Sequence, residues 1–344
     1  MSRTVPRLTA LLVLTFASVS GLAGCAGDDD APQGGDATAP PTDADDPEDA
    51  ESEEPEVEDA PNVPVGRDPV GVAAGAGDAV WVVSFGTSEL ARIRPGGSEP
   101  DLTVPVGDTP LRVTEAFDAV WLTAFHAGEL DRVDPGSGKV TDRVAVGDGA
   151  EGVTSGFGSI WVVAQDSGQL VRVDPKARKV VDRIEIGVGA RLVSAGKDAM
   201  WVGQFNDDKV LRVDPTSGEV TASKKLCSGP QDTVALDGVV WVACTFSDEV
   251  LGLDPRTLEV KRRVEVTGSP DPILATDDGR LFVVAEAGPT VHELDAQTGE
   301  IIWSQVLSDA VALFDNANVD AAVAGEEIWV SSVSHEAVFH TPLP

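Results

Sequence analysis

Aromatic residues recur along this chain at an almost constant interval. Five tryptophans are each 40 residues apart, and Phe282 and Trp329 continue the series at slightly longer spacing: Trp81, Trp121, Trp161, Trp201 and Trp241. A period of about 40 residues, built from several short strands, is typical of the blades of a β-propeller. Seven aromatic markers therefore predict seven copies of one structural unit.

A second marker recurs in phase with the first. Thirteen residues after each aromatic residue stands a turn dipeptide, except after Trp329: Arg94-Pro95, Asp134-Pro135, Asp174-Pro175, Asp214-Pro215, Asp254-Pro255 and Asp295-Ala296. Proline presets the φ angle of a tight turn, and an aspartate side chain caps such a turn by accepting hydrogen bonds from the following backbone. The two markers together indicate that each repeat is a folded unit with a fixed hairpin.

Each unit is predicted to contain four strands. In the third unit the strands are expected at 152–155, 159–165, 169–173 and 180–186, where apolar and polar residues alternate between turn residues. No stretch keeps a helical period. The fold predicted is an all-β, seven-bladed β-propeller of four-stranded blades over residues 60–344. Its tryptophans are expected to pack between neighbouring blades rather than to bind a ligand.

The two ends of this repeat predict how the ring closes. The last unit shows three strands, near 319–324, 327–333 and 337–341, and lacks a fourth. At the other end, Val63–Pro69 matches Val104–Pro110, which is a fourth strand leading into the next blade. Residues 62–65 should therefore complete the seventh blade from the amino-terminal side, which removes the exposed sheet edges of an open ring.

The amino terminus has the pattern of a processing signal. Arg3 and Arg7 precede a largely apolar run, and Leu22-Ala23-Gly24-Cys25 then places small residues before a cysteine. This tetrapeptide resembles the lipobox of bacterial lipoproteins, in which the cysteine is lipidated and becomes the mature first residue. The resemblance implies a signal peptide at 1–24 and lipidation of Cys25. The alternative is a simple signal peptide or membrane anchor with a chance cysteine.

A strongly acidic segment follows Cys25. Between Asp28 and Asp59 there are 15 Asp and Glu and no Lys or Arg. Such a segment buries too little apolar area to offset the entropy of ordering, so residues 25–59 are expected to form a disordered tether. We expect the protein on the extracytoplasmic face of the cell membrane, held there through the lipid on Cys25.

The propeller segment is acidic as well. Of the formal net charge of −33, about −20 falls on residues 60–344. This charge argues against nucleic acid and anionic lipid as direct partners, and it suits a cationic ligand or a divalent cation. The alternative is that the charge serves solubility alone. No cofactor can be named from the sequence, and a monomer is expected.

Cysteine is sparse outside the lipobox. Cys227 and Cys244 form an even pair, and an oxidising compartment permits one disulfide between them. A two-cysteine metal site is the weaker alternative, because no other Cys or His stands at zinc-finger spacing.

Charged residues gather at the predicted channel mouth, the face where inner strands begin and where second strands turn into third strands. The inner-strand starts supply a mixed ring of charges, which is the best candidate site: Arg112, Glu151, Arg191, Asp232 and Asp271. The neighbouring turns offer His126, Gln165, Asn206, Ser247, Glu286 and His335, and the connection 308–318 adds Asp309, Phe314, Asp315 and Asn316. The alternative is a self-compensating ring filled by water.

The recurring pattern Val-Gly-x-x-Pro, Val-Trp-Val and Arg-Val-Asp-Pro resembles the YVTN-type and streptogramin B lyase-like propellers over residues 62–344. The resemblance implies a seven-bladed fold and an extracytoplasmic location. It leaves the function open, because propellers host many activities. Streptogramin B lyase is similar in fold and uses histidine, glutamate and a divalent metal on this face. None of its catalytic positions can be matched here, since His126 and His335 fall in blades two and seven and His292 and His340 fall within third strands. A non-catalytic binding protein for a small ligand or a protein partner is therefore predicted, with a lyase-like enzyme as the alternative.

Overall fold

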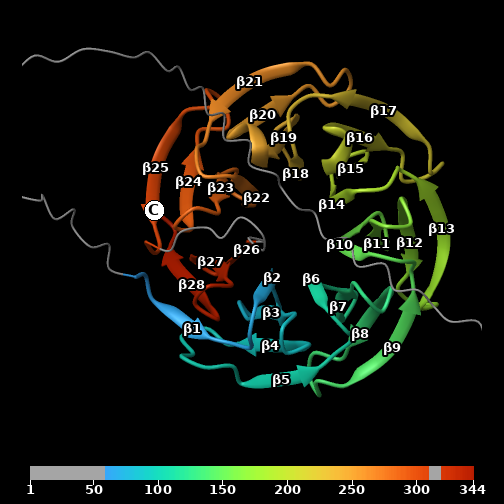
Figure 1. Ribbon diagram of the computed structural model, residues 1–344, viewed down its shortest axis with the longest axis vertical. Helices are drawn as coiled ribbons and strands as arrows, with labels where there is room; N and C mark the ends of the chain where they lie inside the picture. The colour runs from blue at the N-terminus through green and yellow to red at the C-terminus, as the bar shows by residue number, and fades with distance from the viewer. Residues whose placement is uncertain (1–58, 310–318) are drawn as a thin grey trace, which may run out of the picture. The chain divides into compact units, whose positions relative to one another are not determined.

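The computed structural model describes residues 59–309 and 319–344. Within them, 28 strands form seven four-stranded antiparallel sheets, and the only helical elements are two single turns of 3-10 helix, η1 (Phe205–Asp207) and η2 (Thr245–Ser247). Figure 1 shows the sheets set around a centre as blades. The inner strand of each blade contacts the inner strands of both neighbouring blades, so the ring is closed. The predicted seven-bladed β-propeller is confirmed.

Four strands run outward through each blade. The inner strands are β2 (Pro69–Ala74), β6 (Pro110–Ala116), β10 (Ala150–Gly156), β14 (Ala190–Ala195), β18 (Pro230–Leu236), β22 (Pro270–Ala275) and β26 (Ala321–Ala324), which open blades 1 to 7 in that order. The second strands are β3 (Val80–Ser84), β7 (Ala119–Ala124), β11 (Ser159–Ala164), β15 (Met200–Gln204), β19 (Val239–Cys244), β23 (Leu281–Ala285) and β27 (Glu327–Ser332).

The remaining strands lie nearer the rim. The third strands are β4 (Glu89–Ile93), β8 (Glu129–Val133), β12 (Gln169–Asp174), β16 (Lys209–Val213), β20 (Glu249–Leu253), β24 (Thr290–Leu294) and β28 (Ala337–Pro342). The outer strands are β5 (Leu102–Pro105), β9 (Val140–Ala145), β13 (Lys179–Glu185), β17 (Val220–Lys225), β21 (Val260–Glu265), β25 (Ile301–Val306) and, for blade 7, β1 (Asn62–Pro64).

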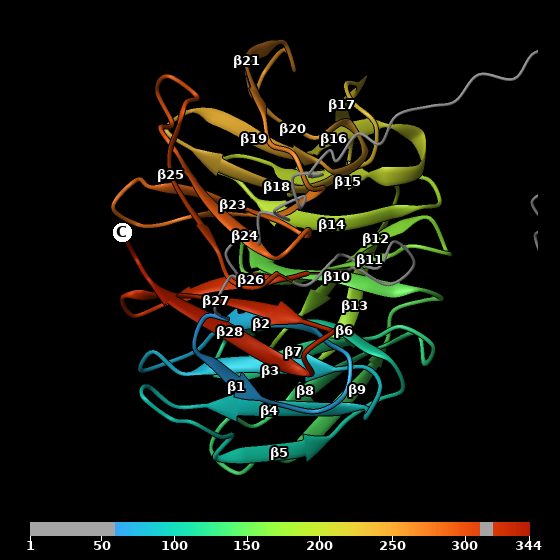
Figure 2. The ribbon, with the colours of Figure 1, turned by 60° about the vertical axis from the view of Figure 1, so that its left-hand side comes forward.

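The ring closes as predicted, through the amino-terminal strand. β1 pairs antiparallel with β28, with Asn62 opposite Phe339 and Pro64 opposite Ala337. Figure 2 shows β1 lying beside β28 at the blade that ends the chain. Val63 on this strand is 1% exposed and packs in one cluster with Trp329 and Val338. First and last segments of the propeller therefore share one sheet.

The recurring aromatic residues join the blades, as predicted. Trp161 of blade 3, for example, lies in one apolar cluster with Met200 and Val202 of blade 4. Trp329 of blade 7 packs with Val80 and Val82 of blade 1, so the same contact also closes the ring. The five tryptophans of the 40-residue series and Phe282 are all under 2% exposed. Aromatic burial at each seam accounts for the sequence period.

The inner strands carry a bulge that positions the channel mouth. In blades 2 to 6 the ladder between the first and second strands skips two residues near its start, for example between Pro230 and Thr233. The two residues in each bulge pair with no residue of the second strand. A bulge of this kind changes the direction in which its side chains point. The bulged pairs are Leu111-Arg112, Glu151-Gly152, Arg191-Leu192, Gln231-Asp232 and Asp271-Pro272.

Candidate functional site

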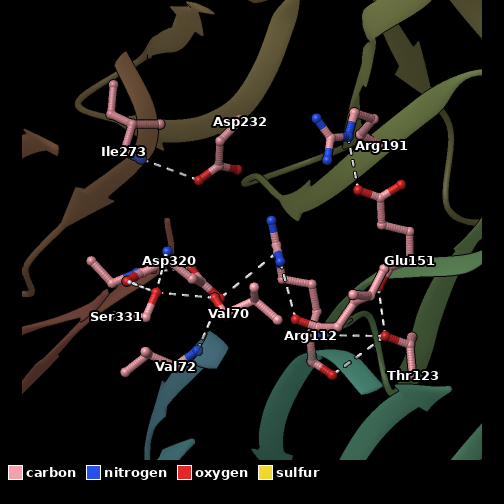
Figure 3. Close-up of polar contacts among 12 residues, drawn as sticks. Val70, Val72, Arg112, Thr123, Glu151, Arg191, Asp232, Ile273, Asp320 and Ser331 are labelled. Carbon is pink, nitrogen blue, oxygen red and sulfur yellow. Dashed lines mark hydrogen bonds and ion pairs between the residues drawn. The ribbon is translucent and has the colours of Figure 1, made fainter. Parts of the chain in front are cut away.

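The bulged residues bring the predicted ring of charges together at the channel mouth. Figure 3 shows Arg112, Glu151, Arg191 and Asp232 extending from four neighbouring blades around the space between the inner strands. Glu151 is 2% exposed, Arg112 is 4% exposed and Asp271 is fully buried. Each bulge therefore supplies a charged side chain to one enclosed cluster, which we call the channel cluster.

The two arginines of the channel cluster are held differently. Arg191 donates a 2.8 Å hydrogen bond from Nε to Oε1 of Glu151 on the preceding blade. Arg112 donates from Nη1 to the carbonyl of Leu111 and lies 3.8 Å, Nε to Oδ2, from Asp320. Its Nε and Nη2 are buried and meet no acceptor at hydrogen-bond distance among the described residues. Arg112 therefore keeps donor capacity that faces the channel.

Asp232 and Asp320 tie adjacent blades together. Oδ2 of Asp232 accepts a 3.2 Å hydrogen bond from the backbone N–H of Ile273, on the next inner strand. Asp320 accepts in the same way from the N–H of Val72, at 3.0 Å, across the seam between blades 7 and 1. Desolvation raises the pKa of Asp232 to about 7 and that of Asp320 to about 6. Both side chains line the channel and satisfy backbone donors, so part of their role is structural.

Asp271 and Glu286 form the acidic centre of the channel cluster. The Asp271 carboxylate is fully buried and interacts through side-chain hydrogen bonds with Glu286 and Gln231. Burial raises the pKa of Asp271, while the charges of Arg112 and Arg191 oppose that rise. Burial, and then the charge of Asp271, raises the pKa of Glu286 to about 9. At neutral pH Glu286 therefore keeps a proton, which it can donate to the Asp271 carboxylate.

The charges of the channel cluster do not balance. Its carboxyl groups are Glu151, Asp232, Asp271, Glu286 and Asp320, and its cations are Arg112 and Arg191. Such an enclosed group with surplus acceptors can take up a cation or a hydrogen-bond donor, which would satisfy polar atoms that are costly to leave unpaired. Because the pKa values of Glu286, Asp232 and Asp320 are raised to about 9, about 7 and about 6, the negative surplus at neutral pH is smaller than the count of groups.

The two histidines predicted for this face lie apart from the channel cluster. Nδ1 of His126 is 2.7 Å from Oγ1 of Thr109, in the exposed turn of blade 2, and 4.0 Å from Asp108. Nδ1 of His335, on blade 7, is 2.8 Å from Oγ of Ser332, and its Nε2 is 3.3 Å from Oγ of Ser308 and 3.7 Å from Asp59. The structure thus brings the five inner-strand residues together and leaves both histidines on separate blades.

The described side chains do not fit the divalent metal that the lyase resemblance implies. Within residues 59–309 and 319–344, no three His, Cys, Asp or Glu side chains are grouped so that they could hold a metal ion. Glu286 is protonated at neutral pH, which weakens it further as a ligand. We therefore derive no chemical step through a metal.

The predicted disulfide is confirmed. Cys227 follows β17 of blade 4 and Cys244 ends β19 of blade 5, and the two are bonded to each other. Cys244 is fully buried in the apolar seam between these blades. The bond links two loops at the channel-mouth face, and the metal alternative for these cysteines is wrong.

Two residues of the channel cluster were outside the predicted ring. Glu286 was named only as a turn residue, because nothing in its spacing shows that the turn of blade 6 folds inward. Asp320 could have been found from the period, since it stands nine residues before Trp329, as Arg112 and Asp232 stand nine before Trp121 and Trp241. Phe314, Asp315 and Asn316 lie outside the described residues, as do Cys25 and residues 26–58 of the acidic tether.

Solved structures with this fold include several lyases. The streptogramin B lyase structure matches with a TM-score of 0.69 at 13% identity, over 82% of this chain and 96% of that one. Virginiamycin B lyase from Staphylococcus aureus matches with a TM-score of 0.68 at 17% identity, over 81% and 96%. The hydrazine synthase of Kuenenia stuttgartiensis matches with a TM-score of 0.63 at 14% identity, over 85% and 98%. What is shared is the fold. Identity this low carries no activity from one chain to the other.

Sequence comparison adds one partial match. The family described as outer membrane protein assembly factor BamB matches residues 206–338, which is less than half of the chain. No curated protein matches this sequence. In the part of the chain that the structure describes, no helix has the length and apolar character needed to cross a bilayer.

Proposed function

We propose that this chain is a lipid-anchored extracytoplasmic binding protein whose channel cluster holds a small organic cation without transforming it. The observation that carries the proposal is the buried acidic centre, where Asp271 and Glu286 are hydrogen-bonded to each other in a cluster that holds five carboxyl groups and two arginines. An ammonium group entering the channel mouth would donate charge-assisted hydrogen bonds to these carboxyl groups and offset the surplus negative charge of the cluster.

Binding is favoured over lyase-like catalysis by the placement of the bases. General-base catalysis needs a base converging with the group that it deprotonates. The contacts of His126 are Thr109, Phe125 and Asp108, and those of His335 come from serines, Asp59 and Phe339. Neither histidine has Asp271 or Glu286 among these contacts. This chain and the lyases therefore share a fold, while we propose that the side chains at the channel mouth serve binding here rather than catalysis.

The proposal is tested by amine binding to the full-length chain purified in detergent. Ethylammonium chloride should raise the melting temperature above that in sodium chloride at equal ionic strength, a control that removes simple screening. Asp271→Asn and Glu286→Gln should each reduce the rise, whereas Asp277→Asn, in an exposed turn, should leave it unchanged. Equal stabilisation by both salts would refute the proposal. A rise with a divalent chloride alone would assign the site to a metal.

A second candidate function, a subunit that holds a protein partner at its rim, is favoured by β25. Ile301, Ile302 and Val306 on this outer strand are 40%, 58% and 45% exposed, and the strand carries no charged residue. The strands at the same position in blades 2 to 5 all carry charges, which normally protect a sheet edge from pairing. An extended apolar segment of a partner could add to this edge. The partial match to an assembly factor family supports this candidate.

A photo-crosslinking residue on β25 tests the second candidate. Placed at Ile302 in the full-length chain in cells, it should give one defined adduct. The same residue at Val181 on β13, which is also exposed, serves as the matched control. Equal labelling from both positions, or none from Ile302, would exclude a partner at this edge.

A further inference from the structure

Phe246 departs from the repeat and is exposed beside the channel mouth. In blades 1, 2 and 4 the residue directly after the second strand is a half-buried phenylalanine, Phe205 in blade 4. In blade 5 Thr245 takes that place, is buried, and donates from Oγ1 to the carbonyl of Pro270 at 2.9 Å. Phe246 is thereby shifted outward to 69% exposure. Repeat packing does not account for a phenyl ring in this position.

The ring of Phe246 is nevertheless held in place. It packs edge-to-face on Phe205, with centroids 5.0 Å apart and an interplanar angle of 62°. Both rings lie over Gly229, where an added Cβ would approach Phe246 to 3.0 Å and Phe205 to 3.1 Å. The backbone N–H of Ser228 donates to Oγ of Ser247 at 2.8 Å, and the disulfide joins the same two loops. The exposed ring is therefore pre-organised rather than freely rotating.

A chain of contacts connects this ring to the channel cluster. The guanidinium of Arg191 lies over the ring of Phe205, 5.0 Å from its centroid. The same side chain bonds to Glu151, and its charge acts on both Asp271 and Glu286. Arg191 thus occupies one face of Phe205 and connects the two rings to the acidic centre, while Phe246 offers an open aromatic surface on the channel-mouth face.

We infer that Phe246 and Phe205 form an aromatic lip for the apolar body of the ligand, so that this site selects organic cations that carry a ring. The inference rests on the proposed function and specifies its ligand class. The ammonium group would lie among the carboxyl groups of Asp271 and Glu286, and the ring would pack on Phe246. Aromatic contacts contribute beyond the area that they bury, and a rigid lip loses little entropy on binding.

Three probes separate the lip from the acidic centre in calorimetric titrations of the full-length chain. Tryptamine carries both an ammonium group and a ring, ethylamine lacks the ring, and tryptophol has the ring without the charge. Tryptamine should bind about tenfold more tightly than either of the other two, from the added aromatic contact or the added charge. Phe246→Ala should remove the advantage over ethylamine and leave ethylamine binding unchanged.

The control variant is Phe157→Ala. Phe157 is also exposed, at 40%, and lies in the turn between β10 and β11, at the opposite end of the strands. Equal affinities for tryptamine and ethylamine, or an equal loss in Phe157→Ala, would overturn the lip while amine binding still depends on Asp271. If Asp271→Asn and Glu286→Gln change the affinity for neither amine, the proposed function itself fails, and the lip fails with it.

Discussion

Arg191 and Glu151 hold the same position on the inner strands of adjacent blades, 40 residues apart, and are joined by a 2.8 Å hydrogen bond from Nε to Oε1. Both stand directly after the first paired residue of their strand, inside the bulge. One repeat position thus supplies opposite charges to the two sides of a blade seam. Most of the channel cluster is built by varying the two residues of this bulge around the ring, since Arg112 and Asp232 are the second residues of their bulges and Glu151, Arg191 and Asp271 are the first.

Removing Arg191 should destabilise the propeller. Arg191→Met leaves the carboxylate of Glu151, only 2% exposed, without its partner. We expect a loss of about 2–3 kcal/mol in the free energy of unfolding, because a buried charge that loses its partner keeps its desolvation cost. Thermal and urea unfolding of the full-length chain measure it. Lys209→Met, which breaks the exposed pair with Asp207, is the control and should cost far less. Equal costs would mean that the Arg191–Glu151 pair is as weak as a surface pair.

Stability should fall as pH rises from about 4.5 to about 9. The pKa of Glu286 is raised to about 9 in the folded chain from an ordinary value of 4.5. The folded state therefore keeps a proton that the unfolded state has lost, and this contribution is fully present below about pH 4.5 and lost as pH passes through about 9. Asp232, with a pKa of about 7, adds to the fall at lower pH. Urea unfolding across this range measures the slope.

Glu286→Gln should flatten the pH dependence between about pH 7 and pH 9, because glutamine stays neutral there. Glu259→Gln, on the exposed rim, should retain the wild-type slope. A wild-type profile that is level or rises with pH in this window would show that Glu286 ionises in the folded chain near its ordinary pKa.

The repeat made most of the fold predictable, because one aromatic residue per blade must fill one seam. Its spacing gave the blade number, the strand order and the closure at residues 62–65. The same logic predicted the inner-strand charges, since in blades 2 to 6 the bulge falls at nearly the same distance before the aromatic. Glu286 could not be placed in this way, because its approach to Asp271 depends on how a turn of blade 6 folds over the channel.

The period also does not predict which side chain stacks on the aromatic residue of each blade. In four blades an arginine opposite the tryptophan stacks on it, as Arg172 does on Trp161 at 5.3 Å. In blade 5 Gly252 stands opposite Trp241, and Arg262 stacks on the tryptophan from the outer strand at 5.8 Å instead. In blade 7 His340 stacks on Trp329. The sequence shows each departure, but which side chain replaces the missing one depends on three-dimensional proximity.

Reduction of the disulfide should lower stability without unfolding the ring. Cys227 and Cys244 are 17 residues apart, and closing a loop of about this size stabilises by about 3 kcal/mol through the unfolded state. A reductant should therefore lower the melting temperature by several degrees. The double variant Cys227→Ala and Cys244→Ala should melt lower and be insensitive to reductant. Two free thiols by intact mass after alkylation of the unreduced protein would contradict the bond.

The closure strand should be essential to stability. Val63→Asp places a carboxylate among Trp329 and Val338, in a seam where Val63 is 1% exposed. We expect a loss of more than about 3 kcal/mol, from lost apolar burial and a buried unpaired charge. Deletion of residues 60–66 should lower the melting temperature further, because it also removes the β1–β28 ladder. Asn62→Asp, at an exposed position of the same strand, is the control. An unchanged melting temperature after the deletion would refute closure through β1.

Membrane attachment should depend on Cys25, if the lipobox pattern is used as we propose. Each buried acyl CH₂ contributes about 0.8 kcal/mol of membrane affinity, so two or three chains on one cysteine would anchor the protein stably. Cys25→Ser should therefore move the protein from the membrane pellet to the soluble extracytoplasmic fraction. The control is a conservative change of a cysteine outside the lipobox, Cys227→Ser, which should leave the protein in the pellet. A Cys25→Ser protein that still sediments with membranes would exclude lipid anchoring at this residue, and the propeller would then need another means of attachment.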